Sequence, residues 1–105
     1  MQERRKFERL VMPKSAAAYV ASENGRKLGP LSILGRGGFQ VDTKKKFKMG
    51  EVHKFFIVDK AEGIKREVTA IARNMPVPGS VGFEFQDLDA DAAVEIGVVI
   101  GKYYS

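Results

Sequence analysis

Three arginines near the start of the chain, Arg4, Arg5 and Arg9, carry the clearest chemical signal because their spacing is R-R-x-x-x-R. A guanidinium is planar and permanently charged, binds phosphate oxygens through paired hydrogen bonds, and stacks on aromatic rings. A phosphorylated purine would use both properties, so this segment is a candidate anion-binding site. The other interpretation is a solvated charged terminus, because terminal residues are often polar and poorly ordered.

A glycine-rich stretch, Gly35-Arg36-Gly37-Gly38, separates two apolar runs. Glycine allows tight turns and lets a ligand approach the backbone closely. The stretch is not a dinucleotide fingerprint, because its glycine spacing is wrong and no helical pattern follows it. We interpret it as a turn that can also admit a ligand.

Other polar residues do not form a catalytic or metal-binding pattern. His53 is the only histidine, and no constellation of carboxylates or serines stands around it in the sequence, so we expect a structural or solvated role. Asp87-x-Asp89-x-Asp91 has the spacing that starts a calcium loop but lacks the downstream glycine and glutamate, so helix capping explains it better. With no nucleophile and base pair and no catalytic carboxylate pair, we expect neither enzymatic activity nor a metal site.

The lysine run Lys44-Lys45-Lys46, followed by Lys48, allows a second interpretation of the basic charge. The net charge of +5 attracts anions without identifying them. Lysines in a loop of a small barrel could contact nucleic-acid phosphates, and salt-sensitive binding to single strands would favour that interpretation. We expect a solvated hairpin loop and no nucleic-acid partner, because the phenylalanines lie in runs typical of a core.

Length and composition indicate one globular domain. The chain has 105 residues, of which 44% are hydrophobic and 30% are charged, and it contains no cysteine. Disulfides and thiolate metal sites are thereby excluded. The longest apolar run, residues 96–100, is far shorter than the roughly 20 residues that span a bilayer. We expect a cytoplasmic protein without a membrane span.

Short alternating runs separated by turns predict an antiparallel β structure. Asn24-Gly25 between two apolar runs is a strong hairpin signal, since both residues tolerate positive φ. After Asp87 the apolar spacing becomes helical, although Gly97 and Gly101 each cost a helix interior about 1 kcal/mol. Apolar residues expected on the inner helix face are Ala92, Ile96, Val99, Ile100 and Tyr103. Strands are expected at 16–22, 28–34, 39–42, 52–59, 64–73 and 81–85.

These elements predict a mainly β fold: a small six-stranded antiparallel β-barrel with a C-terminal α-helix that covers an end or an open edge. Closing a barrel also removes exposed strand edges. We expect a single domain over residues 1–105. It would comprise a flexible arginine segment (1–12), the barrel (14–86) and the C-terminal helix (87–104).

Four features of the sequence occur together: the arginine segment, the antiparallel β body, the Gly-Gly turn before an apolar strand, and Val81-Gly82-Phe83-Glu84-Phe85. Together they resemble the PilZ family of bacterial cyclic di-GMP receptors over nearly the whole chain. The first motif of that family is R-R-x-x-x-R ahead of the barrel. It maps without adjustment onto Arg4, Arg5 and Arg9.

The second motif of that family is Asp or Asn, any residue, Ser, two residues and Gly, just before a strand. Aligning it on Gly37-Gly38 puts Ile33 at the acid or amide position and Gly35 at the serine position. A shift of three residues keeps Ser32 but puts Pro30 at the acid position. In both alignments the side chain that would accept from the guanine edge is missing. By analogy with bidentate contacts between side chains and nucleic-acid bases, the loss of this acceptor lowers the nucleotide affinity by about 1 to 3 kcal/mol, or roughly 5- to 150-fold.

The resemblance implies a cyclic di-GMP receptor whose arginine segment closes over the nucleotide and changes a surface shown to a protein partner in trans. The expected outputs are motility, polysaccharide production or biofilm formation, from a monomer or weak dimer. The alternative is an adaptor with degenerate motifs that contacts proteins and does not bind the nucleotide. The ligand contacts implied are Arg4, Arg5, Arg9, Ile33, Gly35, Arg36, Gly37 and Gly38.

Overall fold

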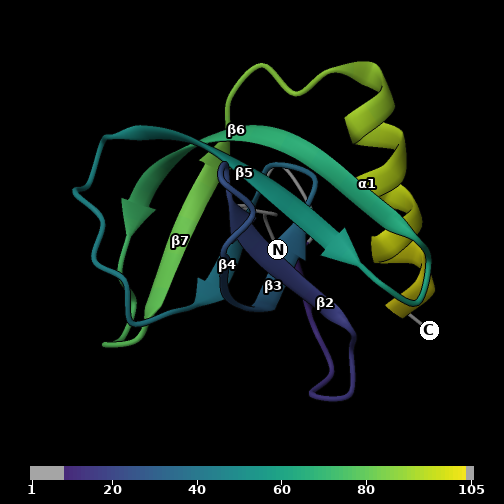
Figure 1. Cartoon of the computed structure of the whole chain (residues 1–105), viewed down its shortest axis with the longest axis horizontal. Coiled ribbons are helices and arrows are strands. Elements are labelled where there is room, and N and C mark those ends of the chain that lie inside the picture. The colour runs from purple at the N-terminus through teal and green to yellow at the C-terminus, as the bar shows by residue number, and fades with distance from the viewer. Residues whose placement is uncertain (1–8, 104–105) are drawn as a thin grey trace, which may run out of the picture.

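The computed structural model describes residues 9–103, which form seven strands and one helix (Figure 1). All strand pairings are antiparallel. Among these residues, no helix has the length and apolar character needed to cross a membrane. In chain order the elements are β1 Arg9–Val11, β2 Ala18–Ser22, β3 Lys27–Gly35, β4 Gly38–Asp42, β5 Val52–Asp59, β6 Ile64–Asn74, β7 Ser80–Phe85 and α1 Ala90–Tyr103.

Strands β2 to β7 close into a barrel, which confirms the predicted six-stranded fold with its C-terminal helix. The sheet order is β1-β3-β2-β5-β6-β7-β4, and the additional pairing of β3 with β4 closes it. The first half of β3 pairs with β2, as at Val20↔Gly29, and its second half pairs with β4, as at Leu34↔Phe39. The ladder between β3 and β4 shifts register between Leu31 and Ile33. Such irregularities bend a strand, as a small barrel requires.

The short strand β1 lies along the same edge of β3 as β2 and continues beyond the end of β2. Arg9 pairs with Gly35 and Val11 with Ile33, and the Met12 N–H donates to the Ser32 carbonyl at 2.9 Å. Residues 9–11, the end of the segment expected to be flexible, therefore belong to the sheet, and residues 1–8 of that segment lie outside the described residues. Pairing satisfies an edge of β3 that would otherwise be open, and Met12 is buried in the core.

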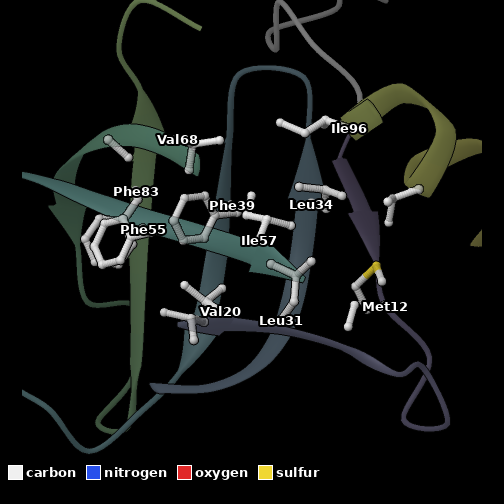
Figure 2. Packing of buried hydrophobic residues seen from close by; sticks show 14 of the residues in the cluster. Met12, Val20, Leu31, Leu34, Phe39, Phe55, Ile57, Val68, Phe83 and Ile96 are labelled. Atoms are coloured by element: carbon white, nitrogen blue, oxygen red, sulfur yellow. The ribbon is translucent and has the colours of Figure 1, made fainter. Parts of the chain in front are cut away.

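Three phenylalanines from different strands form the centre of the core. Phe39 and Phe83 stack with ring centroids 5.1 Å apart, and Phe55 meets Phe83 at 4.7 Å. Aromatic pairs at such separations add to the hydrophobic stabilisation. Figure 2 shows Ile96 pointing from α1 toward Leu34 of β3, so the helix continues the same core.

Helix α1 begins at Ala90, three residues after the expected start. Asp89 caps it, since its Oδ1 accepts from the Ala92 N–H at 2.8 Å. Asp87 has a φ of 53° and belongs to the preceding turn. Figure 1 shows α1 on one side of the barrel and the loop 43–51 on the other. Of the five residues predicted on the inner face of α1, Ala92, Ile96, Val99 and Ile100 are buried, and Tyr103 is half-buried against the core.

Ion pairs at two places attach the outer part of α1 to the barrel. Arg66 Nε donates to Glu95 Oε1 at 2.5 Å, and this hydrogen bond raises the pKa of the guanidinium. At the end of the helix, Lys102 Nζ lies 3.3 Å from Glu62 Oε2 and 3.8 Å from Asp59 Oδ1. The apolar face of the helix therefore packs on the core, and ion pairs at Glu95 and at Lys102 attach it to the barrel at two points along its length.

Candidate functional site

A cavity of about 530 Å³ lies beside the β3–β4 turn. Its lining comes from the end of β3, the turn, the start of β4, and the parts of β6 and β7 next to them. Arg9 of β1 and Leu88 of the β7–α1 connection complete it. Segments distant in sequence therefore meet here, as they do in binding pockets generally.

Five of the predicted ligand residues line this cavity: Arg9, Gly35, Arg36, Gly37 and Gly38. The pairing of Arg9 with Gly35 brings the last arginine of the first motif to the glycine turn. This juxtaposition follows from β1, which the sequence analysis did not anticipate.

The remaining three predicted residues are placed differently. Ile33 is half-buried in β3, pairs with Val11 and Gln40, and does not line the cavity. Arg4 and Arg5 lie outside the described residues. The structure therefore does not bring Ile33 together with the other predicted ligand residues, and the acid position of the second motif contributes no side chain to this cavity.

Strand packing requires glycine at one position of this turn, Gly38. A Cβ atom on Gly38 would collide with the backbone oxygen of Phe83 in β7, so only glycine permits this approach. One residue earlier, the Gly37 carbonyl accepts from the Phe85 N–H at 2.9 Å. Strand β7 is thereby fixed against the turn.

Two further charged residues of the cavity were missed by the sequence analysis. Arg73 of β6 donates through Nε to Glu84 Oε1 of β7 at 2.6 Å, and both side chains are 55% exposed. Their meeting depends on the β6–β7 register, which contains an irregularity between Ala72 and Asn74.

Arg36 extends from the turn toward the helix. A Cβ atom on Gly97 would lie 3.2 Å from Nη1 of Arg36, so the missing side chain lets the guanidinium rest against α1. Among the described residues that line the cavity, Arg9, Arg36 and Arg73 are three cations against one carboxylate, Glu84. Such a balance favours an anionic ligand.

A second hollow, of about 600 Å³, lies near the loop 43–51. Lys45, Lys54 and His53 contribute to its lining, and the Phe47 ring packs against His53 with centroids 5.2 Å apart. His53 Nε2 lies 3.3 Å from Glu51 Oε1. Within residues 9–103, no group of three or more potential ligands could hold a metal ion. The lysines of this loop are exposed, as expected for a solvated loop.

Solved structures of other proteins share this fold. The PilZ domain with c-di-GMP of YcgR from Escherichia coli superposes with a TM-score of 0.75 at 14% identity, over 97% of this chain and 92% of that chain. YcgR in complex with c-di-GMP, also from Escherichia coli, matches with a TM-score of 0.73 at 14% identity, over 95% of this chain and 46% of that chain. The Bacillus subtilis inhibitor of motility, MotI/DgrA, matches with a TM-score of 0.70 at 17% identity, over 96% and 51%.

No family model and no curated protein matches the sequence. The chain spans about half the length of the YcgR and MotI chains in the last two structures. At these identities the likeness establishes the architecture, and the chain has the fold of a PilZ domain.

Proposed function

We propose that this protein is a receptor for cyclic di-GMP and not an enzyme. The observation that carries the proposal is that Arg9, Arg36 and Arg73 line one cavity together with the glycine turn. The same fold occurs in the YcgR domain that was solved with c-di-GMP. The ligand offers two phosphates and two guanines, and guanidinium groups suit both kinds of contact.

Arg4 and Arg5 complete this site in the proposal. Strand β1 fixes Arg9 beside Gly35, and Arg5 precedes Arg9 by four residues. Four residues span at most about 14 Å when extended, so Arg5 is within reach of the cavity. The arginine segment would close over the nucleotide and alter the surface offered to a protein partner in trans, with motility or biofilm formation as the output. Ordering such a segment costs conformational entropy that the arginine contacts must offset.

A protein adaptor that does not bind the nucleotide is the second candidate. It is favoured by Ile33 and Gly35, which occupy the acid and serine positions of the second motif, and by the absence of Ile33 from the cavity lining. The solved structure of the MotI inhibitor of motility shows that this fold occurs in a protein named for a regulatory role.

Calorimetric titration distinguishes the two candidates. The protein is titrated with cyclic di-GMP, and GTP and a single-stranded oligonucleotide serve as controls. Saturable binding of the cyclic dinucleotide alone supports the receptor, whereas no heat up to high micromolar ligand supports the adaptor. Replacing Arg4 and Arg5 with Ala should abolish binding and leave the melting temperature without ligand unchanged. A melting temperature lowered by several degrees would show that the arginines are structural.

A further inference from the structure

Glu84 is the one carboxylate among the described residues that line the cavity. It belongs to β7, where it pairs with Gly38 of β4 on one side and with Ile71 of β6 on the other. Gly38 carries no side chain, so Glu84 stands beside bare backbone. An acidic group beside three arginines needs an explanation, because it lowers the attraction of the cavity for phosphate.

The side chain of Glu84 is oriented by Arg73. Arg73 Nε donates to Oε1 at 2.6 Å, whereas no donor within residues 9–103 forms a hydrogen bond with Oε2. An exposed ion pair of this kind contributes little to stability. It does fix the direction of the carboxylate, and it leaves acceptor capacity on Glu84 and donors on Arg73 for a ligand.

A carboxylate distinguishes guanine from adenine. The Watson–Crick edge of guanine presents two adjacent donors, N1–H and the N2 amino group, and an ionised carboxylate only accepts. Adenine presents an N1 lone pair at the corresponding place, which a carboxylate oxygen repels. A charged acceptor held in place by an arginine therefore selects guanine.

We propose that Glu84, positioned by Arg73, accepts from the Watson–Crick edge of guanine and makes this site prefer cyclic di-GMP over cyclic di-AMP. The inference rests on the proposed function. It assigns to β7 the contact that Ile33 of β3 cannot make, since an apolar side chain that does not line the cavity has no acceptor to offer.

The test compares wild-type protein with Glu84→Gln and Glu84→Ala by calorimetry, using cyclic di-GMP and cyclic di-AMP as probes. Both variants should lose about 5- to 150-fold in affinity for cyclic di-GMP. Affinity for cyclic di-AMP should rise in Glu84→Ala, because the carboxylate that repels adenine N1 is gone, and should rise further in Glu84→Gln, because an amide can donate to adenine N1 and accept from its amino group.

Glu67→Gln is the matched control, since Glu67 is an exposed carboxylate of β6 that does not line the cavity. It should bind both dinucleotides as the wild type does. Melting temperatures of all variants establish that each is folded. Because Glu84 is replaced in two ways, the wild type can still be compared with one folded variant if the other substitution prevents folding.

The outcomes separate the two proposals. Wild-type binding of cyclic di-GMP that Glu84→Gln and Glu84→Ala both retain would overturn the role of Glu84 and leave the receptor intact. Equal wild-type affinity for the two dinucleotides would also overturn it. Wild-type protein that binds neither dinucleotide would overturn the receptor, and the role of Glu84 with it.

Discussion

The guanidinium of Arg36 lies against helix α1 at Gly97, where a Cβ atom would stand 3.2 Å from Nη1 and 3.4 Å from Nη2. Arg36 also lines the cavity beside the glycine turn. One side chain therefore touches both the candidate site and the helix. This contact explains a glycine in the middle of α1, where glycine costs about 1 kcal/mol relative to alanine.

Replacing Gly97 with Ala should stabilise the protein and weaken nucleotide binding. Alanine improves helix propensity, and the crowded neighbour is the far end of an exposed, flexible side chain that can move aside. The free energy of unfolding should rise by about 0.5 to 1 kcal/mol, as measured by urea denaturation. The affinity for cyclic di-GMP should fall several-fold in calorimetry, because Arg36 is no longer held in place.

The matched control is Gly101→Ala, one helical turn later in α1. A Cβ atom there meets nothing within 4 Å, so the substitution should stabilise the helix without displacing Arg36. Nucleotide affinity should stay at the wild-type value. Equal affinities in the two variants would show that the contact between Arg36 and α1 does not position the arginine for binding.

The strands and the helix could be predicted because their apolar residues recur with clear periods. In β6, Val68, Ala70 and Ala72 alternate with more exposed residues, and all three are buried as that pattern requires. The helical spacing likewise identified the buried face of α1. Strand β1 was missed because three residues contain too little periodicity, and its pairing depends on an edge of β3 that exists only in the closed barrel.

The candidate site could be predicted only in part, because it depends on how strands pair. Local sequence identified the glycine turn and Arg36. The contact between Arg73 and Glu84 joins residues 11 positions apart and requires the exact register of β6 and β7. Likewise, nothing near Gly97 in the sequence indicates that Arg36 would lie against it.

Truncation of Phe55 should be the most damaging of the changes proposed here. Its side chain is 2% exposed and contacts the rings of Phe39 and Phe83. Phe55→Ala should lower the free energy of unfolding by about 3 to 5 kcal/mol, because it removes buried area and leaves a cavity. Val94→Ala is the surface control: Val94 is 66% exposed, and this change should stay within about 0.5 kcal/mol in the same urea titration. A small effect at Phe55 would contradict the packing of the aromatic core.

The end of α1 meets a buried carboxylate. Asp59 is 0% exposed, and its Oδ1 accepts from the Ala61 N–H at 3.0 Å. Its Oδ2 is buried without a hydrogen-bond partner among the described residues. The ammonium of Lys102, 3.8 Å from Oδ1, is therefore the nearby positive charge that compensates this group.

Lys102 should make stability depend on pH in the alkaline range. Desolvation lowers the pKa of its ammonium, but the hydrogen bond to Glu62, together with Tyr103 and Asp59, outweighs that effect and raises the pKa above its ordinary value of 10.5. A raised pKa means that the folded state binds the proton more tightly than the unfolded state. The stabilisation is thus fully present below pH 10.5 and is lost as pH rises through the folded-state pKa. Lys102→Met should be less stable than the wild type at neutral pH, and urea titrations should show this difference shrinking above pH 10.5. A difference that stays constant across that range would mean that Lys102 stabilises α1 through its aliphatic chain and not through its charge.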